Sequence, residues 1–247
     1  MSDDGGVWAK VWPDSVVVGN ANFTDAATGT YTDGGVNYKY LTFTGTGSMT
    51  VDTAGKAEVF VLAAGGGSWN TGGGAGGLLQ IPVSLTVQTY TITVGAGGAA
   101  RTNGGDSTIT GTGLNASLAI AFGGGAGFVA WQNGVAGGCG GGAAGLVGGP
   151  ALFSQGYRGG QSPELGTYSG GGGQGGQGLD GSGVGTGGPG IQSTFTGTSV
   201  NRAAGGGGLG AANGTYWTGV NNSGDGGTAF TSDNPGGSGI VIIRVVV

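Results

Sequence analysis

Two segments, 38–44 and 89–94, alternate aromatic or apolar side chains with polar ones. This period-two pattern is typical of a half-buried β-strand. Segments of similar character follow at the spacing of an antiparallel sandwich, namely 48–52, 57–64, 78–83, 106–110 and 116–122. The chain closes on a nearly unbroken apolar run, 240–247, which predicts a strand central in a sheet, with 57–64 as its candidate partner. No stretch has the 3.6-residue period of a capped helix, so the pattern predicts an all-β fold.

Glycine runs interrupt this pattern and recur at 65–67, 72–77, 123–127, 137–145, 170–178 and 205–210. Because ordering glycine costs backbone entropy, such runs are either solvated linkers or backbones packed directly against one another. Linkers combine low hydrophobicity with high charge. This chain is 37% hydrophobic, with 68 glycines and a formal net charge of −5. We therefore predict that the glycine-rich part is ordered.

One glycine run and the residues after it repeat glycine every three residues, at Gly172, Gly175, Gly178 and Gly181. Three residues per turn is the period of polyproline II, whose backbone groups must find partners outside their own helix. Adjacent polyglycine II helices supply those partners, because glycine lets backbones approach closely. We therefore predict antiparallel sandwich-like sheets combined with a polyglycine II-like body that displays loops. The predicted domains are an attachment segment, 1–40, and a glycine-rich β domain, 41–247, comprising strands over 41–122, glycine runs and loops over 123–239, and a closing strand, 240–247.

Composition excludes most catalytic chemistry. The chain has no histidine and one cysteine, Cys139, which removes Ser-His and Cys-His pairs and leaves too few ligands for zinc. Two G-x-G-x-x-A matches, 95–100 and 125–130, are followed by turns and not by the helix that a phosphate site requires. The seven lysines and arginines are scattered, unlike a nucleic-acid-binding surface. We expect no enzymatic activity, cofactor, metal, nucleic-acid partner or membrane insertion.

Bulky residues occur in the segments between glycine runs, where a glycine scaffold would present them. Tryptophan and tyrosine beside asparagine, glutamine and serine are typical of glycan-binding and protein-binding surfaces. The candidate binding residues are Trp69, Trp131, Tyr157, Tyr168, Trp217 and Phe230. The alternative is that these aromatic side chains cap the ends of the glycine bundle. Near the start, Trp8 and Trp12 form an apolar pair that either docks the protein on a larger particle or packs on the first sheet.

The order of several motifs is more specific than any one of them. They are Phe43-Thr-Gly-Thr-Gly47, Glu58-Val-Phe-Val-Leu-Ala-Ala-Gly-Gly-Gly67, Gly74-Ala-Gly-Gly-Leu78, Tyr90-Thr-Ile-Thr-Val-Gly-Ala-Gly-Gly98, Asn103-Gly-Gly-Asp-Ser-Thr108 and Gly236-Gly-Ser-Gly-Ile-Val-Ile-Ile-Arg244. Over roughly 41–247 this order resembles the glycine-rich domain of many bacteriophage tail-fibre and virion proteins. The alternation of glycine runs and loops also resembles the tail-fibre-tip adhesins of T-even-like phages, in which polyglycine II helices form a sandwich and the loops contact the bacterial receptor. This chain has more regular strands and less uniform glycine runs, and the resemblance implies no catalytic residues.

These observations lead to a structural protein at the surface of a bacteriophage virion. The first hypothesis is a tail-fibre or tail-tip adhesin that contacts the host through loops on the glycine scaffold. The alternative is a capsid decoration or other structural protein without receptor binding, which the compact length favours. An ice-binding protein would need flat, regular threonine or alanine faces. The expected partners are other virion proteins, a host surface glycan or outer-membrane protein, and further copies of the chain, with a trimer favoured.

Overall fold

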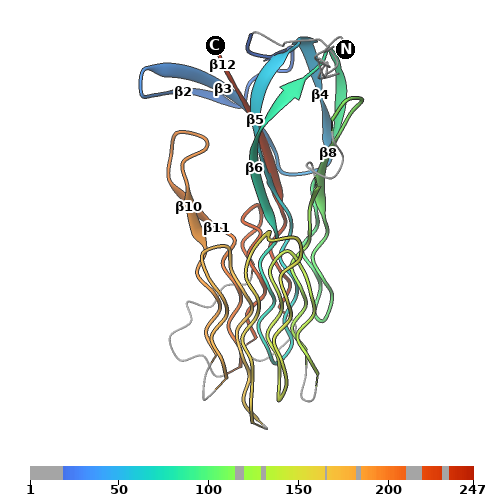
Figure 1. Cartoon of the computed structure of the whole chain (residues 1–247), viewed down its shortest axis with the longest axis vertical. Helices are drawn as coiled ribbons and strands as arrows, with labels where there is room; N and C mark the ends of the chain where they lie inside the picture. The colour runs from blue at the N-terminus through green and yellow to red at the C-terminus, as the bar shows by residue number, and fades with distance from the viewer. Residues whose placement is uncertain are drawn as a thin grey trace, which may run out of the picture.

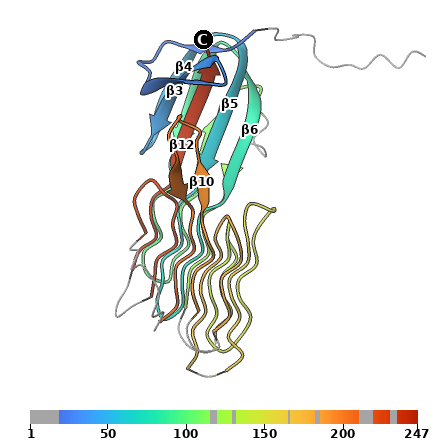
Figure 2. The same ribbon diagram turned by 90° about the vertical axis from the view of Figure 1, so that its left-hand side faces the viewer.

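The structure is a computed structural model that describes residues 19–114, 120–128, 132–164, 166–181, 185–209, 219–229 and 234–247. A β-sandwich occupies one end of the elongated molecule, and long parallel and antiparallel traces of glycine-rich chain occupy the other (Figures 1 and 2). We call the second part the glycine body; it comprises the described residues of 63–77, 94–106, 122–190 and 203–239. The described residues contain no helix, as the sequence pattern predicts.

Two five-stranded sheets and a separate hairpin contain all the described strands. The first sheet has the order β2 (Gly29–Asp33), β3 (Val36–Phe43), β12 (Ile240–Val246), β5 (Gly55–Leu62) and β6 (Leu78–Leu85). The second has the order β1 (Asn22–Phe23), β4 (Gly47–Thr53), β7 (Gln88–Thr93), β8 (Ser107–Thr110) and β9 (Ile120–Ala121). The hairpin joins β10 (Ile191–Ser193) to β11 (Val200–Arg202). Strands β1, β2, β10 and β11 were not predicted, because their short polar sequences have no extended period-two pattern.

The closing strand confirms its predicted position at the centre of the first sheet. Strand β12 pairs antiparallel with β5 on one side and with β3 on the other. Ile243, for example, lies opposite both Leu41 and Val59. Central strands covered on both faces need apolar residues at consecutive positions. The unbroken run at the end of the chain is therefore explained by burial on both sides.

The two faces of β12 bury different clusters. On the inner face, Val241 and Ile243 pack with Val61, Tyr90 and Ile92 in the core between the sheets. On the outer face, Ile240 and Ile242 join a smaller cluster with Phe60, Leu62 and Phe195. Phe195 lies in the connection between β10 and β11, and its ring centroid is 5.6 Å from that of Phe60. The hairpin therefore covers part of the outer face of the first sheet.

The glycine body has the hydrogen-bonding period of polyglycine II. The N–H groups of Ala63 and Gly66 both donate to segment 72–77, at distances of 3.0 and 2.9 Å. Those of Ala64 and Gly67 donate to the chain at 102–105, and those of Gly65 and Ser68 to 234–237. N–H groups three residues apart thus donate to the same neighbouring segment, as in a helix with three residues per turn. In a flat β-strand the N–H groups point alternately to two sides, with a period of two residues. This confirms the predicted polyglycine II-like body.

The path of the chain through the body reverses alternately at its two ends. Strand β5 continues into 63–67, reverses at 68–71 and returns through 72–77 into β6. Comparable reversals at the same far end occur at 99–103, 145–147 and 163–167. We call these four described reversals the far tip. Reversals near the sandwich occur at 138–139, 152–155, 174–176 and 221–224.

Two expectations about the glycine runs differ from the structure. The run 170–178 is not one helix, because a turn at 174–176, with Gly173 N–H donating to Gly176 O, divides it into antiparallel segments. The three-residue repeat seen in the sequence therefore spans two helices. In addition, 63–77 and 94–106 belong to the body, although they lie within 41–122, the part of the predicted β domain that was assigned to strands. Residues before Leu41 also contribute β1, β2 and part of β3 to the two sheets.

Candidate binding surface at the far tip

Glycine is needed in the body mainly for space. The positive-φ glycines, such as Gly145 and Gly166, lie at turns, whereas the glycines in the straight segments have ordinary φ values. A Cβ atom added at Gly206 would lie 1.8 Å from the carbonyl oxygen of Gly227, and one at Gly140 would lie 1.7 Å from that of Gly149. Both distances are far below van der Waals contact with an atom of the rigid backbone. At these glycine positions the interior of the body therefore has no room for a side chain.

Larger side chains are confined to the edges and ends of this bundle. Segment 72–77 is buried throughout and contains only glycine and alanine. In the peripheral segment 95–99, the inward positions Gly95 and Gly98 are buried, while Ala96 and Ala99 are exposed. Burial thus follows the same three-residue period as the hydrogen bonds. A rigid body of this kind displays its functional groups on the flanks or at the reversals.

The far tip brings an aromatic ring and a cation together from two reversals. The guanidinium carbon of Arg101 lies 3.5 Å from the centroid of the Trp69 ring. Arg101 is exposed and has a left-handed backbone with φ of 62°, while Trp69 is half-buried. Cation–π contacts of this type are favourable at partly exposed sites. Arg101 therefore shields one ring face and places a positive charge beside it.

Hydrogen bonds from neighbouring segments hold the tip reversals in place. The buried Thr71 hydroxyl donates to Gly142 O at 2.9 Å and accepts from Phe128 N at 2.8 Å. The Asn103 side chain accepts from Ala126 N at 3.0 Å and donates to Ala136 O at 3.3 Å. Such contacts reduce the conformational freedom that a loop loses when it binds a partner. The tip is therefore preorganised.

Apolar side chains are exposed at another reversal of the far tip. Leu146 and Val147, in the reversal 145–147, are 42% and 55% exposed. Gly134 N–H donates to Val147 O, and Ser162 N–H donates to Leu146 O, so this reversal is tied to segments on both sides. The described part of the tip therefore offers an aromatic ring, a cation, amides and two exposed apolar side chains. These groups suit recognition and provide no nucleophile with a base beside it.

The predicted binding residues are not all in one place. Trp69 lies at the tip, and Tyr168 is half-buried where segment 168–174 leaves the tip. Tyr157 is 50% exposed on the flank of the body, toward the sandwich, since its carbonyl accepts from Gly140 N–H. Five further candidates lie outside the described residues, namely Trp131, Trp217, Phe230, Trp8 and Trp12.

The sequence search missed Arg101, Leu146 and Val147 because it selected only aromatic residues. Their position beside glycine runs is the same signal that identified Trp69, and it would have found them. The flank also carries exposed apolar groups that the search did not select. Phe153, 75% exposed, stacks on Phe122 with ring centroids 4.9 Å apart, and Leu179 is 55% exposed.

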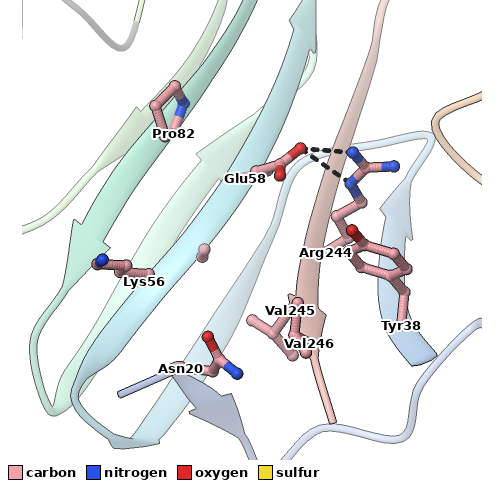
Figure 3. A pocket seen from close by; sticks show the side chains of 9 residues that line it. Asn20, Tyr38, Lys56, Glu58, Pro82, Arg244, Val245 and Val246 are labelled. Atoms are coloured by element: carbon pink, nitrogen blue, oxygen red, sulfur yellow. Dashed lines mark hydrogen bonds and ion pairs between the residues drawn. The ribbon is translucent and has the colours of Figure 1, made fainter. Parts of the chain in front are cut away.

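A separate groove of about 200 Å³ opens on the sandwich (Figure 3). It is lined by Asn20, Tyr38, Lys56, Ala57, Glu58, Pro82, Arg244, Val245 and Val246. Arg244 binds the Glu58 carboxylate through Nη2 at 2.6 Å and Nε at 3.0 Å, and its guanidinium carbon lies 4.3 Å from the centroid of the Phe195 ring. Burial alone would lower the pKa of Arg244, but the hydrogen bonds and charge of Glu58 raise it overall. Arg244 therefore acts as a clamp between β12, β5 and the β10–β11 hairpin.

Two other kinds of site are absent from the part of the chain that the structure describes. No group of histidine, cysteine, aspartate and glutamate there could hold a metal ion. Within the same residues, no helix has the length and apolar character to cross a membrane.

Comparison with known proteins gives a match to a protein family. The model of a family described as a glycine-rich domain matches residues 41–246. The match thus runs from the last residues of β3 to the end of β12 and includes the whole glycine body. A comparison with curated proteins finds no match.

Proposed function

We propose that this chain, which belongs to the family of glycine-rich domains, is a structural protein of a bacteriophage virion. In the virion it would act as a tail-fibre or tail-tip adhesin. The separation of the two ends of the molecule carries the proposal. Gly19 and Val247, the first and last described residues, lie in the sandwich, since Lys56 N–H donates to Gly19 O and Val247 N–H donates to Asn37 O. The reversals of the far tip lie at the other end of the molecule (Figures 1 and 2). In this arrangement the sandwich attaches to the particle and the glycine body holds the far tip away from it.

The chemistry of the far tip supports a recognition role. Trp69 and Arg101 offer a half-buried ring beside an exposed cation, a combination that suits glycans bearing anionic groups or a protein loop. The hydrogen bonds of Thr71 and Asn103 fix the reversals before a partner arrives. The proposed partner is therefore a host surface glycan or an outer-membrane protein.

Capsid decoration, or another structural role without receptor binding, is the second candidate. The exposed side chains of Phe153, Tyr157 and Leu179 favour it, because apolar groups on a flank suit lateral contacts within a particle. The same flank would serve contacts with further copies of the chain, for which a trimer is the proposed assembly. Under this proposal the flank, and not the far tip, carries the essential contacts.

Particles carrying variants at the two surfaces distinguish these functions. We expect Arg101→Ala and Trp69→Ala to lower adsorption to host cells at least about tenfold, since truncating a hot-spot residue typically costs about 2 kcal/mol. Tyr157→Ala and Leu179→Ser are the matched controls, exposed residues on the flank, and they should adsorb normally. Amounts of variant protein in purified particles are measured in parallel. Normal adsorption by both tip variants, with poor incorporation of the flank variants, would support decoration and exclude the adhesin function.

A further inference from the structure

Three side chains from both sheets meet in the sandwich, away from the glycine body. Lys39 comes from β3 in the first sheet, while Asn22 and Asp52 come from β1 and β4 in the second. The Lys39 Nζ atom contacts the Asn22 Oδ1 atom. The Asn22 Nδ2 atom in turn donates to Asp52 Oδ1 at 2.8 Å. The contact between the amine and the carboxamide thus joins the two sheets, and the carboxamide is in turn bonded to the exposed carboxylate of Asp52.

Lys39 occupies an unusual position for a lysine. Alternation along β3 places it on the same face as the buried Leu41, and across the ladder it lies opposite the buried Val245. Its Nζ atom is 4.2 Å from the centroid of the buried Phe23 ring and donates to Phe23 O at 3.2 Å. The amine is therefore directed from the first sheet toward the second, against an apolar ring that limits its contact with water.

A β-bulge brings Asp52 to the same place. Asn22 lies opposite Thr53 and Phe23 lies opposite Val51, so the register shifts and Asp52 is the extra residue on β4. Bulges re-aim side chains that a regular ladder would direct elsewhere, and they are common beside reactive sites. The shift allows the Asp52 carboxylate to reach the Asn22 amide nitrogen.

We propose that Lys39 and Asn22 join in a covalent isopeptide bond between the two sheets, with Asp52 as the proton carrier. The Lys39 ammonium group first gives up one proton to water. The neutral Nζ then attacks Asn22 Cγ, and a C–N bond forms. Asp52 takes up one Nζ proton and delivers it to Nδ2. The Cγ–Nδ2 bond then breaks and ammonia leaves, so that one amide replaces another and no oxidant or cofactor is consumed.

The orientation of the Asn22 amide agrees with this reaction. Its Oδ1 atom faces the lysine amine, and its Nδ2 atom, the leaving group, faces the carboxylate that must protonate it. The bond would anchor β1, a strand of two residues, to the first sheet. Because β1 follows directly on the start of the described chain, it is the strand that a pull from the preceding residues would load first.

Mass spectrometry of the purified full-length protein tests the proposal. We expect an intact mass lower than that of the sequence by one ammonia molecule. Trypsin should then fail to cleave after Lys39 and should yield a single peptide spanning 11–56, lighter by ammonia, because Lys10 and Lys56 are the flanking cleavage sites. An intact mass equal to that of the sequence, with ordinary peptides 11–39 and 40–56, would overturn the proposal and leave a hydrogen-bonded clamp.

Variants separate the cross-link from other losses of ammonia. Lys39→Arg should restore the full mass, whereas Lys56→Arg, a lysine outside the triad, should keep the loss. Succinimide formation at Asn103-Gly104, Asn133-Gly134 or Asn213-Gly214 also releases ammonia, but it would persist in Lys39→Arg and leave Lys39 open to trypsin. Asp52→Asn keeps both reacting groups and should slow the cross-link at least about tenfold, as expected for loss of an acid–base residue. Unchanged conversion in this variant would overturn the role of Asp52.

Discussion

The sandwich and the glycine body build an interior in opposite ways. The sandwich buries large side chains, including Tyr90, Phe60 and Met49, each with no exposed surface. Burial of apolar area at about 25 cal/mol/Å² drives this kind of packing. In the body, segments 63–67 and 72–77 have little beyond Cα and Cβ atoms to bury, and their N–H groups bond to neighbours in three directions. Backbone hydrogen bonding and close approach replace the hydrophobic core there.

This difference determines where each region tolerates change. A side-chain core accepts hydrophobic substitutions that conserve volume. The body interior accepts no added atom, because its neighbours are carbonyl groups of the rigid backbone. Its edges and reversals are open, however, so residues such as Arg101 and Leu146 can vary without disturbing the bundle. A scaffold with an invariant interior and variable loops is well suited to presenting different surfaces.

The largest expected effect is the loss of the glycine body on adding one methyl group to its interior. Gly140→Ala and Gly206→Ala place a Cβ atom 1.7 and 1.8 Å from carbonyl oxygens, and we expect each to lower the free energy of unfolding by about 4 kcal/mol or more. Gly45→Ala is the matched control, since nothing lies within 4 Å of its added Cβ and its φ is ordinary. Urea unfolding measures all three. A stable, native-like Gly206→Ala protein would contradict the close-approach explanation.

A smaller loss is expected in the sandwich core. Ile243→Ala should cost about 2–5 kcal/mol and Ile243→Val about 0.5–1.5 kcal/mol, because Ile243 has no exposed surface and its removal leaves a cavity. This graded response to volume is the signature of a side-chain core. The same denaturation experiment provides the comparison. If Ile243→Val were as damaging as Gly206→Ala, the proposed contrast between the two regions would be wrong.

Stability should also fall slightly as pH rises, through one buried carboxyl of the body. Burial raises the pKa of Asp225, although hydrogen bonds from Ser223 and Ala204 lower it. Because the folded-state pKa lies above the unfolded value, the stabilising contribution is complete below that unfolded value and is lost as pH rises through the folded pKa. The unfolding free energy of the wild type minus that of Asp225→Asn, which cannot ionise, should decrease from about pH 4 upward. An increasing difference would refute the assigned cause.

The smallest change is expected at the junction of the two regions, where Cys139 is fully buried. Burial raises the pKa of its thiol to about 12. The thiolate is the reactive form, so the folded protein should resist alkylation by iodoacetamide at neutral pH. Unfolding in urea should restore ordinary labelling, and Cys139→Ser supplies the blank. Rapid labelling of the folded protein would mean that the body opens locally beside the sandwich.

Several features were predictable because they depend on local chemistry. The alternation in 89–94 and the apolar run at 240–247 identified β7 and β12, since side-chain period and burial are directly related. Lys39 shows the limit of this reasoning. It was assigned to the polar positions of its strand, yet it lies on the same inner face as the buried Leu41. The aromatic residues Tyr38 and Tyr40 lie on the opposite, outer face, where they contact the Tyr31 ring. The bulge at Asp52 and the approach of Asn22 could not be seen along one strand.

The glycine runs determined by themselves that a polyglycine II bundle would form, because only residues with little or no side chain permit that approach. They did not determine which run lies beside which. Segments such as 65–67, 72–77 and 205–208 are nearly identical in composition, so their local sequence hardly specifies which segment pairs with which. The tertiary structure decided it through the connections. The strands of the sandwich fix where β5, β6 and β12 enter the body, and short reversals then bring each run beside the next. The contact of Arg101 with Trp69 follows from that path, since it joins two reversals of the body. The contacts of Asn22 follow instead from the packing of the two sheets of the sandwich.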